Sequence, residues 1–276
     1  MTELTVRRLL VDLETPIPRH WCGGDAFRTA LFNALSMSFP AGEQIFIDSV
    51  KKALADLPAD KREALAAEAQ GFIGQEATHR RIHERFNAQL AAQGLKNHWE
   101  RRILARRQRL MEPVTDARGW AGVTAATEHW TAIFAQHLLA GPGLLQGAEP
   151  RLAALWQWHS AEELEHRSTA FDLYRALGGS ELWRRRLFRI VSFNFVVDTA
   201  RQTANNLWHD GTLFRPRTWA SAWRTLFGRE GLVRCGWRPW REYLRADFHP
   251  LQGDGRSGEH WLAAHAELAQ PVRQAA

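Results

Sequence analysis

Apolar residues recur every three or four positions along most of the chain, within stretches rich in Ala, Leu, Glu, Gln and Arg. Segments in which Val, Ile or Thr alternate with polar residues are nearly absent. This period places apolar side chains on one face of a helix, so the sequence predicts an all-α fold. We expect helices from residue 41 to the segment 56–60, from residue 60 to the segment 91–95, over 98–111, over about 115–140, and from just after residue 150 to 177–179.

Breaker residues set these boundaries. Pro40 and Gly42 come just ahead of an apolar-periodic run, so the first helix is expected to begin near residue 41. Asp60 is a suitable N-cap for the second helix, and Gly94 is a suitable C-terminal stop.

Two of the expected helices carry the same pattern of acid and histidine. FIGQEATHRRIHERFN contains Glu76 and, three residues later, His79, and WHSAEELEHRSTAFDLY repeats this spacing with Glu163 and His166. Residues three, four or seven apart share a helix face, so each helix can present its pair to the same interior. A further histidine lies one turn away in each segment: His83 and His159.

Each of these two helices follows a helix with a lone glutamate. Glu43 precedes Glu76 by 33 residues, and Glu128 precedes Glu163 by 35. A dinuclear site in a ferritin-like four-helix bundle takes one Glu from each of two helices and a Glu-x-x-His pair from each of the other two. We therefore predict two bound divalent metal ions, with iron favoured and manganese or zinc as alternatives. The expected ligands are Glu43, Glu76, His79, Glu128, Glu163 and His166.

Some roles within the motif stay open. Glu162 lies four residues before His166, but we prefer Glu163 as the ligand because its spacing matches the first pair. Glu162 is then either a competing ligand or a hydrogen-bonding partner of a ligand. His83 and His159 are candidate catalytic residues, with additional ligands or hydrogen-bonding partners of the ligands as alternatives. A buried polar network without metal is a further alternative, although unpaired buried charge is costly. For two other histidines we expect a helix-packing or outward-facing position, His129, and a turn role, His249, with a loop that folds over the site as the alternative for His249.

The chain lacks a linker rich in Gly, Ser or Pro that would separate domains. We expect a single domain over 1–276, with a metal-binding four-helix bundle over 20–179. Residues 180–276 form a Trp- and Arg-rich segment, which we expect to be a helical extension packed on the bundle. It includes an expected helix over 181–210 and an amphipathic segment over 258–270.

The net charge of +6 raises the question of an anionic partner. The basic clusters are mixed with Leu, Ile and Phe at helical spacing, as on solvated helix faces, so binding of nucleic acid is not expected. Contact with a membrane surface is an open alternative because Trp residues lie beside Arg in the extension. A homodimer is also open. The Trp residues concerned are Trp219, Trp223, Trp237 and Trp240.

The sequence contains few signals that indicate a cellular location. The N-terminal segment has no apolar core or cleavage site typical of a secretory signal, and no apolar run approaches the length of a membrane span. Cys22 and Cys235 are far apart and lack the spacing of a thiolate zinc site. The sequence therefore predicts a soluble cytoplasmic protein.

Four segments together indicate a family. They are LSMSFPAGEQIFIDSV (35–50), the two acid-and-histidine segments described above, and FHP (248–250). In combination they resemble the bacterial family of predicted metal-dependent hydrolases, which is similar to ferritin-like di-iron carboxylate proteins. The resemblance extends from about residue 20 to 255. It implies the same six ligands, with the two additional histidines as close neighbours.

Three functions are compatible with such a site. The favoured one is an O₂-dependent oxidase or oxygenase that acts on an apolar organic substrate, because the donor set is rich in carboxylates and contains two His and no Cys. The alternative is a metal-dependent hydrolase that uses a metal-bound hydroxide, with the extra histidines as proton carriers. The third is a metal store or redox sensor without enzymatic activity.

Overall fold

The computed structural model describes residues 4–141 and 143–272. Most of these residues are helical, which confirms the predicted all-α class. The helices are α1 (Ala26–Asp56), α2 (Ala59–Ala92), α3 (Trp99–Arg106), α4 (Ala117–Leu139), α5 (Pro150–His166), α6 (Thr169–Ala176), α7 (Glu181–His209), α8 (Pro216–Phe227), α9 (Leu232–Glu242) and α10 (Arg256–Ala264). The shorter elements are β1 (Arg7–Leu9), β2 (Ala269–Pro271), the π-helical turn η1 (Arg107–Met111) and the 3-10 turns η2 (Gly143–Leu145) and η3 (Pro250–Gln252).

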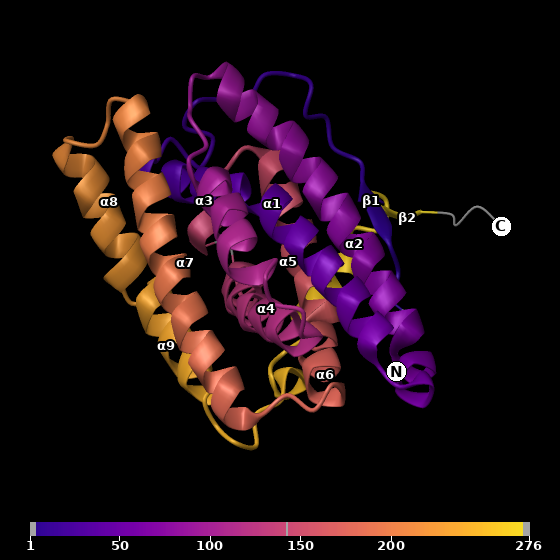
Figure 1. Ribbon diagram of the computed structural model, residues 1–276. Helices are drawn as coiled ribbons and strands as arrows, with labels where there is room; N and C mark the ends of the chain where they lie inside the picture. Colours follow the sequence, from indigo (N-terminus) through magenta and orange to yellow (C-terminus); the bar gives the residue numbers. More distant parts are fainter. Residues whose placement is uncertain (1–3, 142, 273–276) are drawn as a thin grey trace.

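The helices pack in layers (Figure 1). α1 packs along α2 and α4 along α5, and contacts between α1 and α4 join the two pairs into a bundle. α7 packs on both α1 and α4, while α8 contacts α1 and α9 contacts α4. These three helices form an outer layer, at the left in Figure 1, whereas the short β1–β2 sheet lies beside α2 at the right.

Helix α1 begins at Ala26, so the predicted start near residue 41 is wrong. Pro40 lies inside the helix. Proline has no N–H to donate to the carbonyl four residues earlier, which leaves the carbonyl of Ser36 without its helical partner. Asn87 of α2 replaces that partner, because its Nδ2 donates to the Ser36 carbonyl at 2.9 Å. A contact between two helices thus compensates for the proline.

The helix expected from residue 150 to 177–179 is two helices, α5 and α6. The guanidinium of Arg167 donates to the carbonyl of Leu164 and, at 3.2 Å, to that of Pro250. In a continuous helix the Leu164 carbonyl would accept from the backbone N–H of Ser168. Arg167 takes that acceptor, and the helix is interrupted just after His166, the last expected ligand.

The N-terminal segment crosses α2 at two glycines. Gly71 and Gly74 lie one turn apart, and a Cβ on either would clash with Leu4 or Val6, respectively. This close approach brings β1 beside α2, where it pairs antiparallel with β2. The amphipathic segment expected over 258–270 is helical in α10 and ends in this strand, which the sequence did not indicate.

Candidate metal centre

The six predicted metal ligands lie together between four helices. Each is at most 2% exposed to solvent. Residues three apart project from the same side of a helix, so the two Glu-x-x-His pairs converge with the lone glutamates of the facing helices. The contributions are Glu43 from α1, Glu76 and His79 from α2, Glu128 from α4, and Glu163 and His166 from α5.

Their ligand atoms form two overlapping groups, and within each group these atoms all lie within 4.8 Å of one another. The first group is Glu76, Glu128, Glu163 and His166. The second group is Glu43, Glu76 and His79. Glu76 belongs to both, so its carboxylate lies where two neighbouring cations would share it.

Most polar atoms that face this space have no hydrogen-bond partner within the described part of the chain. They are both carboxylate oxygens of Glu43, Glu76 and Glu128, one oxygen of Glu163, Nδ1 of His79 and Nε2 of His166. His166 Nε2 approaches Glu76 Oε1 to 3.2 Å, but without the alignment of a hydrogen bond. A buried polar atom without a partner costs roughly 1–3 kcal/mol, and more when it is charged. Two divalent cations would cancel the charge of the four carboxylates, so these side chains fit such a pair.

The pKa values of the metal-free side chains are strongly perturbed. Burial raises the pKa of Glu43 well above its ordinary value, and burial together with repulsion from Glu163 raises that of Glu128 to about 8. Burial alone would lower the pKa of His79, but the hydrogen bond with Glu162 and the negative charges of Glu162 and Glu76 outweigh it and raise the pKa to about 10. Protons therefore occupy the site when cations do not, and metal binding must displace them.

The nitrogen of each ligand histidine that faces away from the cluster has a hydrogen-bond partner. His79 Nε2 lies 3.0 Å from Glu162 Oε2, and His166 Nδ1 lies 2.9 Å from Gln75 Oε1. Because these nitrogens donate outward, the other nitrogen of each ring presents its lone pair to the cluster. The neighbouring residues Glu162 and Glu163 therefore point in different directions. Glu162 contacts the outer side of His79, whereas Glu163 faces the cluster.

Arg7 of β1 joins these two supports. Its guanidinium lies 3.2 Å from Glu162 Oε1 and 2.7 Å from Glu165 Oε2, and Gln75 Nε2 donates to the same Glu165 oxygen at 2.8 Å. One cationic side chain therefore holds the partners of both histidines. The sequence motif does not identify three of these supporting residues, Arg7, Gln75 and Glu165. Gln75 and Glu165 adjoin predicted ligands in the sequence, but no local signal connects Arg7 with Glu162, which follows it by 155 positions.

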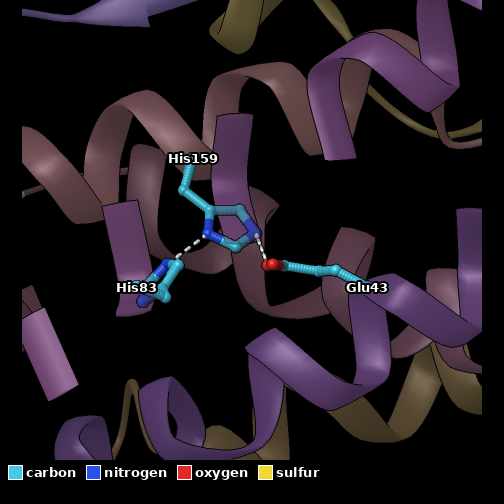
Figure 2. Close-up of side chains that lie close together, drawn as sticks. All are labelled: Glu43, His83 and His159. Atoms are coloured by element: carbon cyan, nitrogen blue, oxygen red, sulfur yellow. Dashed lines mark hydrogen bonds and ion pairs between the residues drawn. The ribbon is translucent and has the colours of Figure 1, made fainter. Parts of the chain in front are cut away.

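His83 and His159, the predicted catalytic residues, lie beside Glu43 of the cluster (Figure 2). His159 Nε2 lies 2.9 Å from Glu163 Oε1 and 4.0 Å from Glu43 Oε1, while its Nδ1 lies 2.6 Å from His83 Nε2. Burial lowers the pKa of both rings, that of His159 to about 4, so both are neutral near pH 7. Glu43, His83 and His159 also offer ligand atoms within 4.8 Å of one another, so a ligand role for His159 stays open beside a catalytic one.

The surrounding hydrogen bonds assign the protons on these two rings. Asn87 donates through Nδ2 to the Ser36 carbonyl, so its Oδ1 accepts the proton of the Ser36 hydroxyl at 2.8 Å. The Ser36 oxygen then accepts from His83 Nδ1, also at 2.8 Å. His83 Nε2 in turn accepts from His159 Nδ1, so the lone pair of His159 Nε2 faces Glu163 Oε1 at 2.9 Å, where a proton or a cation would lie between the two atoms.

A comparison with known proteins places the chain in a family. The model of the family described as predicted metal-dependent hydrolase matches residues 5–254. The chain belongs to this family. The resemblance seen in the sequence is thereby confirmed over most of the chain. No curated protein and no solved structure matches it, so the likeness to ferritin-like di-iron proteins stays a prediction.

Membership of the predicted metal-dependent hydrolases supports a metal-dependent enzyme, in keeping with the buried Glu and His groups. It favours the hydrolytic alternative over the oxidase or oxygenase, for which the comparison gives no support.

Two further histidines of this predicted metal-dependent hydrolase lie outside the cluster. His129 Nε2 lies 3.0 Å from the carbonyl of Pro239, and the ring packs against Phe188. His249 Nε2 lies 2.8 Å from Asp172 Oδ1, at the start of η3. These are packing and turn positions, as expected from the sequence.

Proposed function

We propose that the protein is a hydrolase that binds two divalent cations between α1, α2, α4 and α5 and acts on a small apolar substrate. The observation that carries the proposal is the set of buried, unpartnered ligand atoms around the shared carboxylate of Glu76. Two cations held there would lower the pKa of a water molecule toward neutrality and polarise the bond that is cleaved. Iron, manganese and zinc all accept such oxygen and nitrogen donors.

The six ligands have complementary positions in this proposal. Glu43 and His79 would hold one cation, and Glu128, Glu163 and His166 the other, while Glu76 belongs to both groups of ligand atoms. The supports behind both histidines keep the rings oriented in the absence of metal, so little reorganisation accompanies binding.

His159 is the proposed proton acceptor. Its ring is neutral near pH 7, and the lone pair of its Nε2 is directed at the cluster. When Nε2 accepts a proton, Nδ1 can release one to His83 Nε2, and His83 Nδ1 already donates to Ser36. Phe39 packs over both rings, with centroid distances of 4.6 Å to each, and shields the pair from bulk water.

An anaerobic assay tests the proposal. The protein is stripped of metal and reloaded separately with Zn²⁺, Mn²⁺ or Fe²⁺, bound metal is measured by elemental analysis, and cleavage of p-nitrophenyl esters with short and long acyl chains is followed without O₂. We expect two cations per chain and metal-dependent cleavage that is faster with long acyl chains. His159→Gln should keep the metals and lose about 100-fold in kcat. His249→Gln, a histidine outside the cluster, is the matched control and should keep full activity.

Other outcomes identify the competing functions. No turnover with any of the three metals, combined with O₂ uptake and a transient visible absorption of the Fe²⁺ form, contradicts hydrolysis and supports an oxygenase. Stoichiometric metal binding with neither reaction supports a metal store or redox sensor.

A further inference from the structure

Helix α7 has an inverted distribution of side chains. Its buried face carries polar residues, among them Asp198 and Gln202. The stripe that faces solvent is apolar instead, with Ile190 55% exposed and Phe193 70% exposed. A surface helix of a globular protein normally directs its apolar stripe toward the core, so the exposed stripe requires a separate explanation.

The next two helices repeat the inversion. Small and hydroxyl-bearing residues such as Ser221 and Thr225 form the buried side of α8, whereas Trp219 is 56% and Trp223 is 67% exposed. In α9 the buried position is Gly236, and Trp237 is 57% exposed. We call the exposed side chains of residues 182–241 the outer face; it covers the layer of α7, α8 and α9 at the left in Figure 1.

The outer face is also strongly basic. Residues 181–242 contain twelve Arg and five acidic residues, a net charge of +7 that exceeds the +6 of the whole chain. Ten of these Arg are exposed, but Glu230 is the only exposed acid of the segment. Asp198 and Asp210 are neutralised by partners outside the segment, Arg102 and Arg19.

We propose that the outer face docks on the surface of a bilayer that contains anionic lipids. Aromatic and aliphatic side chains interleaved with Arg match both parts of such a surface: the apolar side chains enter the boundary between headgroups and acyl chains, and the guanidinium groups pair with phosphate. No helix within residues 4–141 and 143–272 has the length and apolar character needed to span a membrane, so the contact is with the surface.

Two other partners fit this face less well. In a symmetric dimer the outer face would meet its own copy, and ten exposed Arg would lie on each side of the interface, where like charges repel. Nucleic acid would satisfy the Arg side chains but offers nothing to aliphatic residues, which have no surface for stacking on bases. Leu182, Ile190 and Val196 are such residues, and all three are exposed.

Vesicle sedimentation tests the proposal independently of any enzymatic activity. The full chain is mixed with vesicles of phosphatidylcholine alone, or of phosphatidylcholine with about one third phosphatidylserine, and the bound fraction is measured at low and high salt. We expect binding to the anionic vesicles only, with a loss at high salt and a blue shift of Trp emission on binding.

Paired substitutions identify the surface. Phe193→Gln with Trp223→Gln should weaken vesicle binding about tenfold or more, because both side chains lose their insertion into the boundary region. Leu10→Gln with Val272→Gln is the matched control, since these apolar residues are 43% and 44% exposed near the β1–β2 sheet. It should bind like the unmodified protein.

A second pair tests the charge. Arg186→Gln with Arg234→Gln should also weaken binding about tenfold, while Arg8→Gln with Arg81→Gln, the same change of charge elsewhere on the surface, should not. All positions are exposed, so melting temperatures should stay unchanged.

Several results would overturn the proposal. One is a failure to bind anionic vesicles, and another is that the control pairs weaken binding as much as the outer-face pairs. A third is that the protein does not bind vesicles but forms a homodimer or an oligonucleotide complex that the outer-face substitutions disrupt.

Discussion

Arg7 offers the sharpest test of how the candidate metal centre is supported. Replacing it with Met keeps much of the side-chain volume but removes its three hydrogen bonds to carboxylates, one to Glu162 and two to Glu165. The Arg7 side chain is 15% exposed and that of Glu162 is 0% exposed, so solvent screens this contact little. Hydrogen bonds to charged groups contribute roughly 1.5–3 kcal/mol each, so both histidine supports should loosen.

The expected magnitude follows from the position of Arg7 behind both histidines. Loss of such an outer partner lowers metal affinity about 10- to 100-fold, which is about 1.4–2.8 kcal/mol. Because the hydrogen bonds reach His79 through Glu162 and His166 through Glu165 and Gln75, the affinity for both cations should fall.

The assay is competition with a chromophoric chelator for Zn²⁺ or Mn²⁺, with circular dichroism to verify that the variant is folded. Arg8→Met is the matched control: Arg8 is exposed, and no ion pair involves it within the described residues. Unchanged affinity for both cations in a folded Arg7→Met variant, or loss at one site alone, would refute the role of Arg7 as a joint support.

Four other predictions concern the same centre. Glu76→Ala should abolish binding of both cations because Glu76 belongs to both ligand groups. Glu128→Ala should lower the affinity for one cation more than for the other, because Glu128 belongs to one group. Elemental analysis measures the bound metal, and competition titration measures the affinities. Chelation of the metal should lower the melting temperature, since a ligand at 100 times its Kd stabilises a protein by about 2.7 kcal/mol. Metal-free protein should lose stability as the pH rises, because folding raises the pKa of Glu128 from 4.5 to about 8 and that of His79 from 6.5 to about 10. The stability contributed by their bound protons therefore falls between about pH 4.5 and pH 8 for Glu128 and between about pH 6.5 and pH 10 for His79. In chemical denaturation the metal-loaded form should lack this dependence. Asn87→Leu should reduce kcat without loss of metal, because Ser36 then loses the acceptor that sets the proton on His83.

The sequence was most informative where a local rule decides the geometry. The spacing of three residues in Glu76/His79 and Glu163/His166 is a property of one helix turn, so the convergence of these side chains could be predicted without knowledge of the packing. Helix type and approximate extent followed from apolar periodicity in the same way.

Predictions failed where a distant residue changes the local outcome. Pro40 normally ends a helix, but Asn87 from another helix satisfies the carbonyl that proline leaves free, and α1 continues. Arg167 interrupts a segment with no proline or glycine at the break, because it binds a carbonyl of its own helix and one from η3. Arg7 is the extreme case, since its position depends on the pairing of two strands from distant parts of the sequence.

That pairing gives the centre an order of assembly. Residues 7–9 meet their partners only at 269–271, so the strand that carries Arg7 cannot be paired during synthesis until residues 269–271 have left the ribosome. Contacts of such long sequence separation form late and slowly in folding. If the centre binds metal as proposed, the ligand helices would bind a cation early but tightly only after this pairing, and a nascent chain should exchange its metal much faster than the finished protein.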